Sequence, residues 1–196
     1  MIYEIDGIKP VISEKAFVHE SAVIIGDVII EEGSYIGPNS SIRGDFGRIL
    51  IGKNVNIQDC CILHGYTGID TIIEENGHIG HSAILHSCHI KNNAMVGMGA
   101  VIMDKAVVGC NSIVGASSLV PGMMNIPDNH LALGIPAKVK RELREEEIEW
   151  KRESTQSYID LTTRCLKDFK SCEPLKELTP ARNAKRFEMD YTPKNS

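Results

Sequence analysis

A six-residue repeat of aliphatic side chains runs through most of this 196-residue chain and limits what it can fold into. A small side chain lies four residues after most of the repeat positions. An α-helix would repeat every ~3.6 residues and an amphipathic strand every two, so a period of six indicates the hexapeptide repeat of a parallel β-helix. The repeat positions are Val18, Ile24, Ile30, Ile36, Ile42, Ile51, Ile57, Leu63, Ile73, Ile79, Leu85, Ile90, Val96, Ile102, Val108, Val114 and Val120.

Each hexad should form a short strand and a corner, so that three hexads close one triangular coil. The aliphatic side chain enters the narrow core, and successive coils stack roughly 4.8 Å apart. We expect the β-helix to span residues 11–120. A loop containing Pro121, Gly122 and Pro127 should follow, and then a last extended turn over residues 131–136.

The composition changes after residue 140. Residues 141–170 are charged, lack Gly and Pro, and carry apolar side chains at helical spacing, which predicts an α-helix that packs along the β-helix or on a neighbouring subunit. Pro174 should end this segment. The expected organisation is a β-helix domain over residues 1–140, a C-terminal helix over 141–172 and a polar tail over 173–196.

Composition excludes several classes of partner. The net charge is −5 and the basic residues are not gathered into a stripe, which disfavours nucleic-acid binding. The six cysteines contain no CxxC pair, and we interpret them as reduced thiols of a cytoplasmic protein. Neither a signal peptide nor an apolar run of ~18 residues is visible, so we expect no membrane span.

Three histidines take defined places in the repeat. His64 and His86 each follow a core leucine by one residue, and those leucines fall on the same face of successive coils. Both histidines should therefore point outward, one above the other, roughly 5 Å apart at the backbone. His81 follows a core isoleucine by two residues and should lie near the corner of the preceding face.

This spacing predicts a metal site that one chain cannot complete. His81 and His86 are separated by about 16 Å of extended chain, whereas metal–nitrogen bonds are only ~2 Å long. Three copies around a three-fold axis solve the problem, with His64 and His86 from one subunit and His81 from the next. We therefore expect a homotrimer with a metal at each interface.

A second pair of residues follows the same phase. Arg43 should lie one coil below His64, and Asp59 one coil below His81. The contact that brings His81 to its neighbour should then pair Asp59 with the neighbour's Arg43, fixing the subunit register. A structural interface pair and direct help in orienting the substrate both remain open for these residues. Metal binding is not expected of the other histidines, which are His19, His78, His89 and His130.

The stretches 41–45, 56–59 and 80–86 resemble the γ-class carbonic anhydrases, and the resemblance covers about residues 10–170. It implies a left-handed β-helix homotrimer that holds zinc, or iron or cobalt, on three histidines at each interface. Stretches 43–48, 77–86 and 163–165 narrow the match to the subgroup of phenylacetic-acid-degradation and carnitine-operon proteins. The phenylacetate members are associated with hydrolysis of CoA thioesters. The implied site residues are Arg43, Asn56, Gln58, Asp59, His64, His81 and His86.

The chain departs from the best-known γ enzymes at their proton-transfer residues. In those enzymes a glutamate follows the Arg-Gly-Asp sequence and an acidic loop follows the first histidine ligand. In this chain Phe46 takes the place of the glutamate, and residues 65–71 take the place of the acidic loop. Fast proton export is therefore not expected. Phe46 and Tyr66 are instead candidates for an apolar wall that meets the substrate.

The resulting hypothesis is a metal-dependent enzyme of the γ-carbonic-anhydrase type. A metal-bound hydroxide would hydrate CO2 or attack an acyl-CoA thioester, and Gln58 would orient the nucleophile. Two alternatives stay open. A CoA-dependent hexapeptide acyltransferase would use one interface histidine as general base and need no metal. A non-catalytic trimeric scaffold would use neither, and the retained histidine set argues against it.

Overall fold

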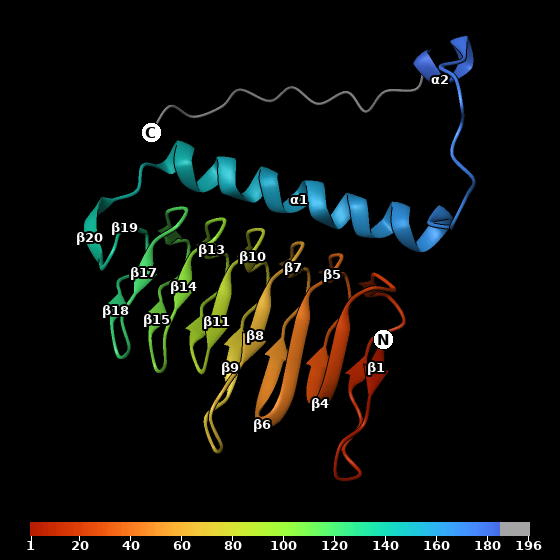
Figure 1. Ribbon diagram of the computed structural model, residues 1–196. Helices are drawn as coiled ribbons and strands as arrows, with labels where there is room; N and C mark the ends of the chain where they lie inside the picture. Colours follow the sequence, from red (N-terminus) through yellow and green to blue (C-terminus); the bar gives the residue numbers. More distant parts are fainter. Residues whose placement is uncertain (185–196) are drawn as a thin grey trace.

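The computed structural model describes residues 1–184 as a left-handed parallel β-helix with a long helix, α1 (Glu145–Asp168), laid along one side (Figure 1). A short helix, α2 (Pro180–Ala184), follows within the expected polar tail. The last part of that tail, residues 185–196, lies outside the described residues. No helix in the described part of the chain is long and apolar enough to cross a membrane.

Three strand faces form the solenoid. Two of them belong to one sheet, because the long strands β4 (Val23–Ile30) and β6 (Ser41–Ile51) bend around a corner and contribute to both. The first face continues through β1 (Ile2–Tyr3), β8 (Ile62–His64), β11 (Ile84–His86), β14 (Val101–Ile102) and β17 (Leu119–Val120). The second comprises β2 (Val11–Ile12), β9 (Thr71–Ile73), β12 (His89–Ile90), β15 (Val107–Val108) and β18 (Asn125–Ile126).

The third face is a separate sheet that lies nearest helix α1. All of its pairings are parallel except the last, in which β20 runs antiparallel to β19. Its strands are β3 (Phe17–Val18), β5 (Tyr35–Ile36), β7 (Asn56–Ile57), β10 (His78–Ile79), β13 (Met95–Val96), β16 (Ile113–Val114), β19 (His130–Gly134) and β20 (Ala137–Glu142).

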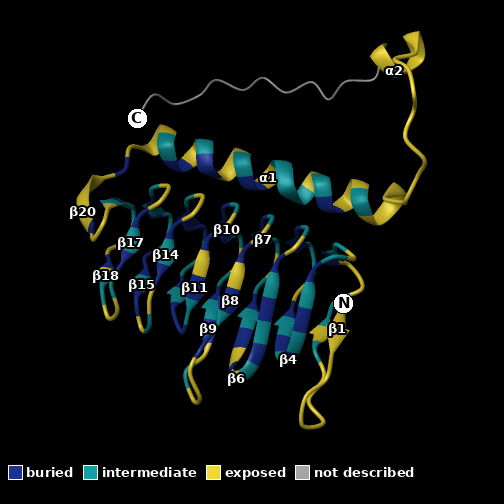
Figure 2. Ribbon diagram, viewed as in Figure 1, coloured by how far each residue is buried: buried dark blue, intermediate teal, exposed yellow. Residues whose placement is uncertain are grey.

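The six-residue phase predicts the core correctly. Every predicted repeat position is buried except Val18, which is half-buried, and along the long strands β4 and β6 buried residues alternate with more exposed ones (Figure 2). The core also continues past the predicted end at residue 120, through Ile126 and Ala132. These two residues keep the six-residue spacing from Val120, so the prolines beside them lie at corners of further coils and not in a long loop.

The predicted start of the C-terminal helix was wrong by four residues. Arg141 and Glu142 belong to strand β20, and the helix begins at Glu145. Arg144 is the N-cap residue, and its backbone N–H donates to the Glu147 carboxylate at 2.9 Å. The helix ends at Asp168, ahead of Pro174 as expected.

One corner of the solenoid carries a ladder of asparagines. Asn93, Asn111 and Asn129 all take positive φ values, between 55° and 59°, a conformation that asparagine tolerates better than most residues. The Asn93 amide donates to Asn111 at 2.7 Å, and the Asn111 amide donates to Asn129 at 2.8 Å. The ladder thus consists of side-chain hydrogen bonds that join three successive coils.

Helix α1 closes the end of that ladder with a buried lysine. Lys151 is fully buried, and its ammonium donates to the Asn76 carbonyl at 2.5 Å and to Asn93 Oδ1 at 2.7 Å. Burial lowers the pKa of Lys151 to about 7. The same helix face buries Ile148, Thr155 and Thr162, which fixes the helix along the third face.

Candidate active site at two edges of the β-helix

His64 and His86 form a stacked pair on one edge of the first face. The register of β8 and β11 places them directly opposite each other, and their ring centroids are 5.3 Å apart. The phase of the repeat is the reason, since both follow a core leucine by one residue. The structure therefore confirms the predicted stacking of these two side chains.

A carboxylate holds each of these two rings. His64 Nε2 lies 2.9 Å from Asp45 Oδ1, and His86 Nδ1 lies 2.5 Å from Asp104 Oδ1. Arg43 donates to the other oxygen of Asp45. Partial burial acts to raise the pKa of Asp45, but the hydrogen bonds from Arg43 and His64 outweigh it and hold that pKa below its ordinary value.

Sequence reasoning missed the roles of Asp45 and Asp104. Asp104 follows a core isoleucine by two residues and lies eighteen residues after His86, so the phase of the repeat places it one coil above that histidine. Asp45 lies beyond a core position on the long strand β6, where the phase slips. The position of Asp104 could have been found by counting along the repeat, whereas the position of Asp45 depends on how β6 bends.

Two aromatic rings flank the histidine pair. Phe46 lies 5.5 Å from His64 and Tyr66 lies 5.1 Å from His86, measured between ring centroids. Both side chains are exposed, at 60% and 59%. They form an apolar surface beside the two imidazoles, and contact with a substrate remains a prediction for both.

His81 lies on the opposite edge of the first face. Its Nδ1 is 3.4 Å from Asp59 Oδ2 of the coil below, and its side chain is 41% exposed. Within residues 1–184 of one chain, no three His, Cys, Asp or Glu side chains are grouped so that they could hold a metal ion. A complete three-histidine site therefore requires a second copy, and the pairing of Asp59 with a neighbour's Arg43 remains a prediction.

The surface between these two edges is apolar. Ile62 and Ile84 point outward from β8 and β11 and are 45% and 37% exposed, and Met98 and Met103 lie exposed near the corners. Self-association through this face would bury these side chains and bring the edge of one copy toward the opposite edge of another.

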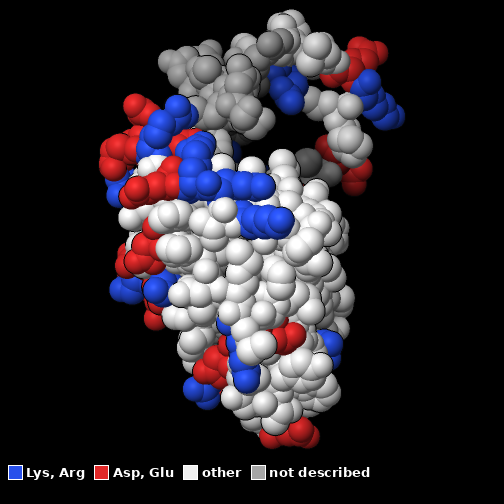
Figure 3. All heavy atoms as spheres, turned by 90° about the vertical axis from the view of Figure 1, so that its left-hand side faces the viewer, with Lys and Arg blue, Asp and Glu red and all other residues white. Residues whose placement is uncertain are grey.

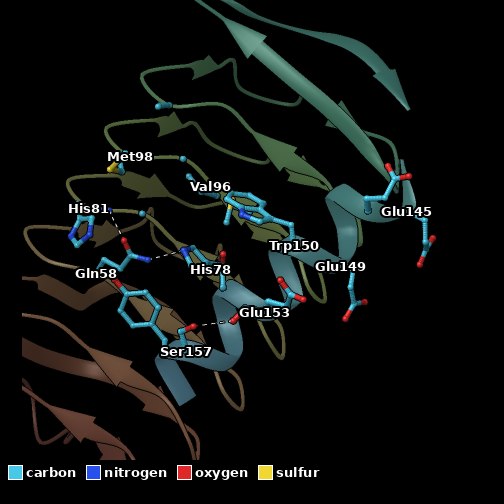
Figure 4. Close-up of a pocket in the computed structure, with 17 residues that line it drawn as sticks. Gln58, His78, His81, Val96, Met98, Glu145, Glu149, Trp150, Glu153 and Ser157 are labelled. Carbon is cyan, nitrogen blue, oxygen red and sulfur yellow. Dashed lines mark hydrogen bonds between the residues drawn. The ribbon is translucent and has the colours of Figure 1, made fainter. Parts of the chain in front are cut away.

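A buried polar network lies behind His81, beneath helix α1. Gln58 Nε2 lies 2.9 Å from Asn56 Oδ1 and 2.7 Å from His78 Nε2, while Gln58 Oε1 accepts the backbone N–H of His81 at 3.3 Å (Figure 4). Thr155 of α1 reaches the other ring nitrogen of His78 at 3.4 Å.

This network holds Asn56 and Gln58, two of the four candidate catalytic residues, of which Arg43 and Asp59 are the others. Burial lowers the pKa of His78 to about 3, so the ring is neutral and accepts a hydrogen bond from Gln58. Asn56 is fully buried and Gln58 is 4% exposed. Asn56 and His78 thus hold the Gln58 amide in one orientation, and a catalytic role for Asn56 or Gln58 remains a prediction.

Comparison with known proteins decides the family. The carnitine operon protein CaiE of Escherichia coli K12 is 47% identical over 192 residues, covering 98% of each chain. The Proteus protein of the same name is 48% identical over 174 residues, covering 89% of this chain and 88% of its own. The chain belongs to the CaiE family. The CaiE resemblance confirms the carnitine-operon part of the predicted subgroup.

The wider matches are to hexapeptide transferases. The family model described as bacterial transferase hexapeptide (six repeats) matches residues 9–44. A Bacillus cereus protein provisionally named an acetyltransferase is 41% identical, with a TM-score of 0.83 and coverage of 84% of this chain and 96% of its own. A hexapeptide transferase family protein from Anaplasma phagocytophilum is 38% identical, with a TM-score of 0.80 and coverage of 83% and 96%. These likenesses confirm the predicted fold.

Proposed function

We propose that this protein of the CaiE family is an enzyme that transfers acyl groups from CoA thioesters, with His86 as the general base. The observation that carries the proposal is the 2.5 Å contact between Asp104 Oδ1 and His86 Nδ1. A carboxylate on one ring nitrogen orients the imidazole, fixes its tautomer and leaves the other nitrogen to accept a proton. His86 is also partly exposed, so a substrate can reach it.

The chemistry follows from that arrangement. His86 Nε2 takes the proton from the hydroxyl or amine of an acceptor as the acceptor oxygen or nitrogen attacks the thioester carbonyl. The tetrahedral intermediate collapses, the carbon–sulfur bond breaks, and the CoA thiolate receives the proton from the imidazolium. Asp104 stabilises the imidazolium while it exists. Phe46 and Tyr66 offer an apolar surface beside the reacting groups.

The family relationships support acyl transfer over CO2 hydration. The matching family model is one of transferases, and the Bacillus cereus relative is named for acetyl transfer, a reaction in which a CoA thioester is the usual donor. The CaiE name places the E. coli relative in a carnitine operon. Carnitine carries a hydroxyl group, so it is a reasonable first acceptor to test.

We further propose that the working enzyme is a homotrimer. The exposed apolar face between the two edges would be covered by a second copy, and His81 with its fixed Gln58 would then face the neighbour's His86. Catalysis would take place between subunits. The protonation steps assigned to His86 do not depend on this assembly, but the walls of the site do.

The test is release of free thiol from acetyl-CoA and butyryl-CoA, with and without an acceptor such as L-carnitine, and mass analysis of the product. We expect thiol release that needs an acceptor, yields the acylated acceptor, persists in the presence of a chelator and is lost in His86→Asn. Thiol release that needs no acceptor and stops with the chelator would overturn the transferase assignment.

A second candidate is metal-dependent hydrolysis or hydration, and the stacked histidines favour it. Two imidazoles 5.3 Å apart, each held by a carboxylate, resemble metal ligands with their supporting hydrogen bonds. His64 and His86 would hold Zn²⁺, Fe²⁺ or Co²⁺ together with His81 of a second copy. Such an ion would supply a water of lowered pKa and polarise a carbonyl or CO2.

Metal analysis of the untagged protein separates the two candidates. About one metal per chain in the oligomer, lost in His64→Ala, His81→Ala and His86→Ala alike, would favour the metal enzyme and call for assays of CO2 hydration and thioester hydrolysis. A metal-free oligomer that stays empty after zinc or anaerobic iron is supplied would leave the transferase as the remaining enzyme.

A further inference from the structure

A long groove separates the first half of helix α1 from the third face of the β-helix. Its volume is about 990 Å³, and it runs from Gln58 and His81 at one end to Glu145 at the start of the helix (Figure 4). The groove thus reaches one of the two edges described above, although none of the proton transfers assigned to His86 uses it.

The walls of the groove are mainly apolar. Met95 and Val96 of β13, with Met98 beside them, form the sheet side, and Trp150 and Tyr158 contribute rings from the helix. Trp150 points from the helix toward Val96 (Figure 4). Sulfur, aliphatic carbon and aromatic rings offer few acceptors for a ligand N–H, but they pack well against methyl groups.

The burial of the Trp150 indole N–H is energetically unfavourable. That N–H has no hydrogen-bond partner among the described residues. An unpaired buried donor is unfavourable, and a leucine or methionine would fill an apolar contact without that penalty. The tryptophan is therefore difficult to explain by packing alone, whereas the aromatic ring itself has a use if the groove binds a cation.

The charge of the groove has one sign. Four glutamates line it and, among the described residues, no lysine or arginine does so. Glu145 and Glu146 lie in the first turn of α1, where they also offset the helix dipole. Glu149 and Glu153 lie beyond that turn. Three of the four glutamates have an arginine partner that does not line the groove: Glu149 and Glu145 lie 3.0 and 3.8 Å from Arg152, and Glu146 lies 3.8 Å from Arg144. Glu153 therefore contributes the most available negative charge.

We infer that this groove binds a small molecule that carries a quaternary ammonium group. Methyl groups around the nitrogen would pack against the methionines and Trp150, and the carboxylates would attract the positive charge. A quaternary ammonium carries no N–H, so it can lie against the apolar walls without leaving a donor unpaired. The phosphates of CoA would be repelled by the glutamates, so the groove is not the site of the CoA nucleotide. The inference concerns binding alone and does not rest on acyl transfer.

The test compares two probes of nearly equal shape on the full chain. Choline carries the quaternary ammonium, and 3,3-dimethyl-1-butanol replaces its nitrogen by carbon and is uncharged. Saturation-transfer NMR and calorimetric titration should show that choline binds and that added salt weakens the binding, while the neutral isostere binds at least tenfold more weakly. Equal binding of the two probes, or no binding of choline, would overturn the inference.

Variants locate the site. We expect Glu149→Gln with Glu153→Gln to weaken choline binding about tenfold, and Trp150→Leu to do the same, whereas Trp150→Phe keeps most of the affinity because it keeps a ring. The control is Glu14→Gln with Glu20→Gln, which removes the same charge from exposed positions away from the groove. Unchanged affinity in both groove variants would place any cation site elsewhere. Thiol release from acyl-CoA, measured in parallel, reports separately on the proposed reaction.

Discussion

Two ladders of like side chains run along different edges of this solenoid, and they differ in what completes them. In the asparagine ladder each amide donates to the next, and Lys151 from helix α1 closes its end. In the histidine ladder the rings lie 5.3 Å apart, bond to carboxylates and remain partly exposed. The same stacking geometry therefore produces a structural element where the side chains satisfy one another, and the proposed catalytic edge where His86 keeps a ring nitrogen free for a substrate.

The largest expected effect comes from a substitution in the histidine ladder. His86→Ala should reduce the rate of acyl transfer by a factor of about 10² to 10⁴, because a general base contributes that much. The melting temperature should fall only modestly, since the hydrogen bond lost to Asp104 of the coil above lies at a partly exposed edge. Steady-state kinetics and thermal unfolding check both points, with His130→Ala as the matched control at the start of strand β19, where the histidine is half-buried. A His86→Ala variant of normal activity would contradict the assignment.

The stability of the protein should depend on pH through Lys151, which closes the asparagine ladder. Its pKa is about 7 in the folded protein and near its ordinary value of 10.5 in the unfolded chain, so between these values the unfolded state binds more protons. The free energy of unfolding should therefore rise as the pH is raised from about 7 to 10, by on the order of 3 kcal/mol.

Lys151→Met is the comparison for this pH effect. It removes the titrating group while keeping a long apolar side chain, so its unfolding free energy should lack the rise between pH 7 and 10. Urea denaturation at several pH values measures the difference between the two proteins. Parallel pH profiles for the two proteins would show that Lys151 titrates normally in the folded state.

A smaller loss of stability is expected inside the asparagine ladder. Asn111→Ala leaves the Asn93 donor and the Asn129 acceptor without their partner and puts alanine at a φ of 58°. The expected loss is about 1–3 kcal/mol of unfolding free energy, with no change in acyl transfer. The exposed Asn125→Ala should change neither quantity. A loss of activity in Asn111→Ala at full stability would blur the distinction between the two ladders.

The smallest effect concerns the edge that bears His81. Asp59→Asn should weaken the predicted contact with a neighbour's Arg43 and raise the dissociation constant of the oligomer about fivefold, which corresponds to ~1 kcal/mol. Sedimentation over a range of concentrations measures it. An unchanged association constant would remove Asp59 from the subunit contact.

The repeat predicts the solenoid because one periodic signal fixes both burial and stacking. Counting in sixes places His64 directly below His86 without any knowledge of side-chain conformations. It does not predict strand β20, where the alternating Lys138, Val139 and Lys140 precede a helical pattern with no glycine or proline to mark the boundary. The charges at the end of that strand placed Arg141 and Glu142 within the predicted helix.

The parts of the site that depend on tertiary packing could not be predicted. His78 becomes a buried partner of Gln58 only because helix α1 covers it with Thr155, and no local pattern announces that contact. The groove under Trp150 has the same origin, since it forms between the third face and helix α1. Periodicity describes one coil after another and carries no information about a helix that lies across them.

Strand β20 affects whether two solenoids can associate end to end. It is the last strand of the third face, and Figure 3, which views the molecule from that end, shows charged side chains gathered in its upper part while the middle is largely uncharged. Its exposed residues include three basic ones, which are Lys138, Lys140 and Arg141. A bare parallel edge would offer its backbone to the next solenoid and permit end-to-end polymers. On the third face, the reversed, charged strand therefore disfavours the addition of another solenoid at the point where the chain turns into helix α1.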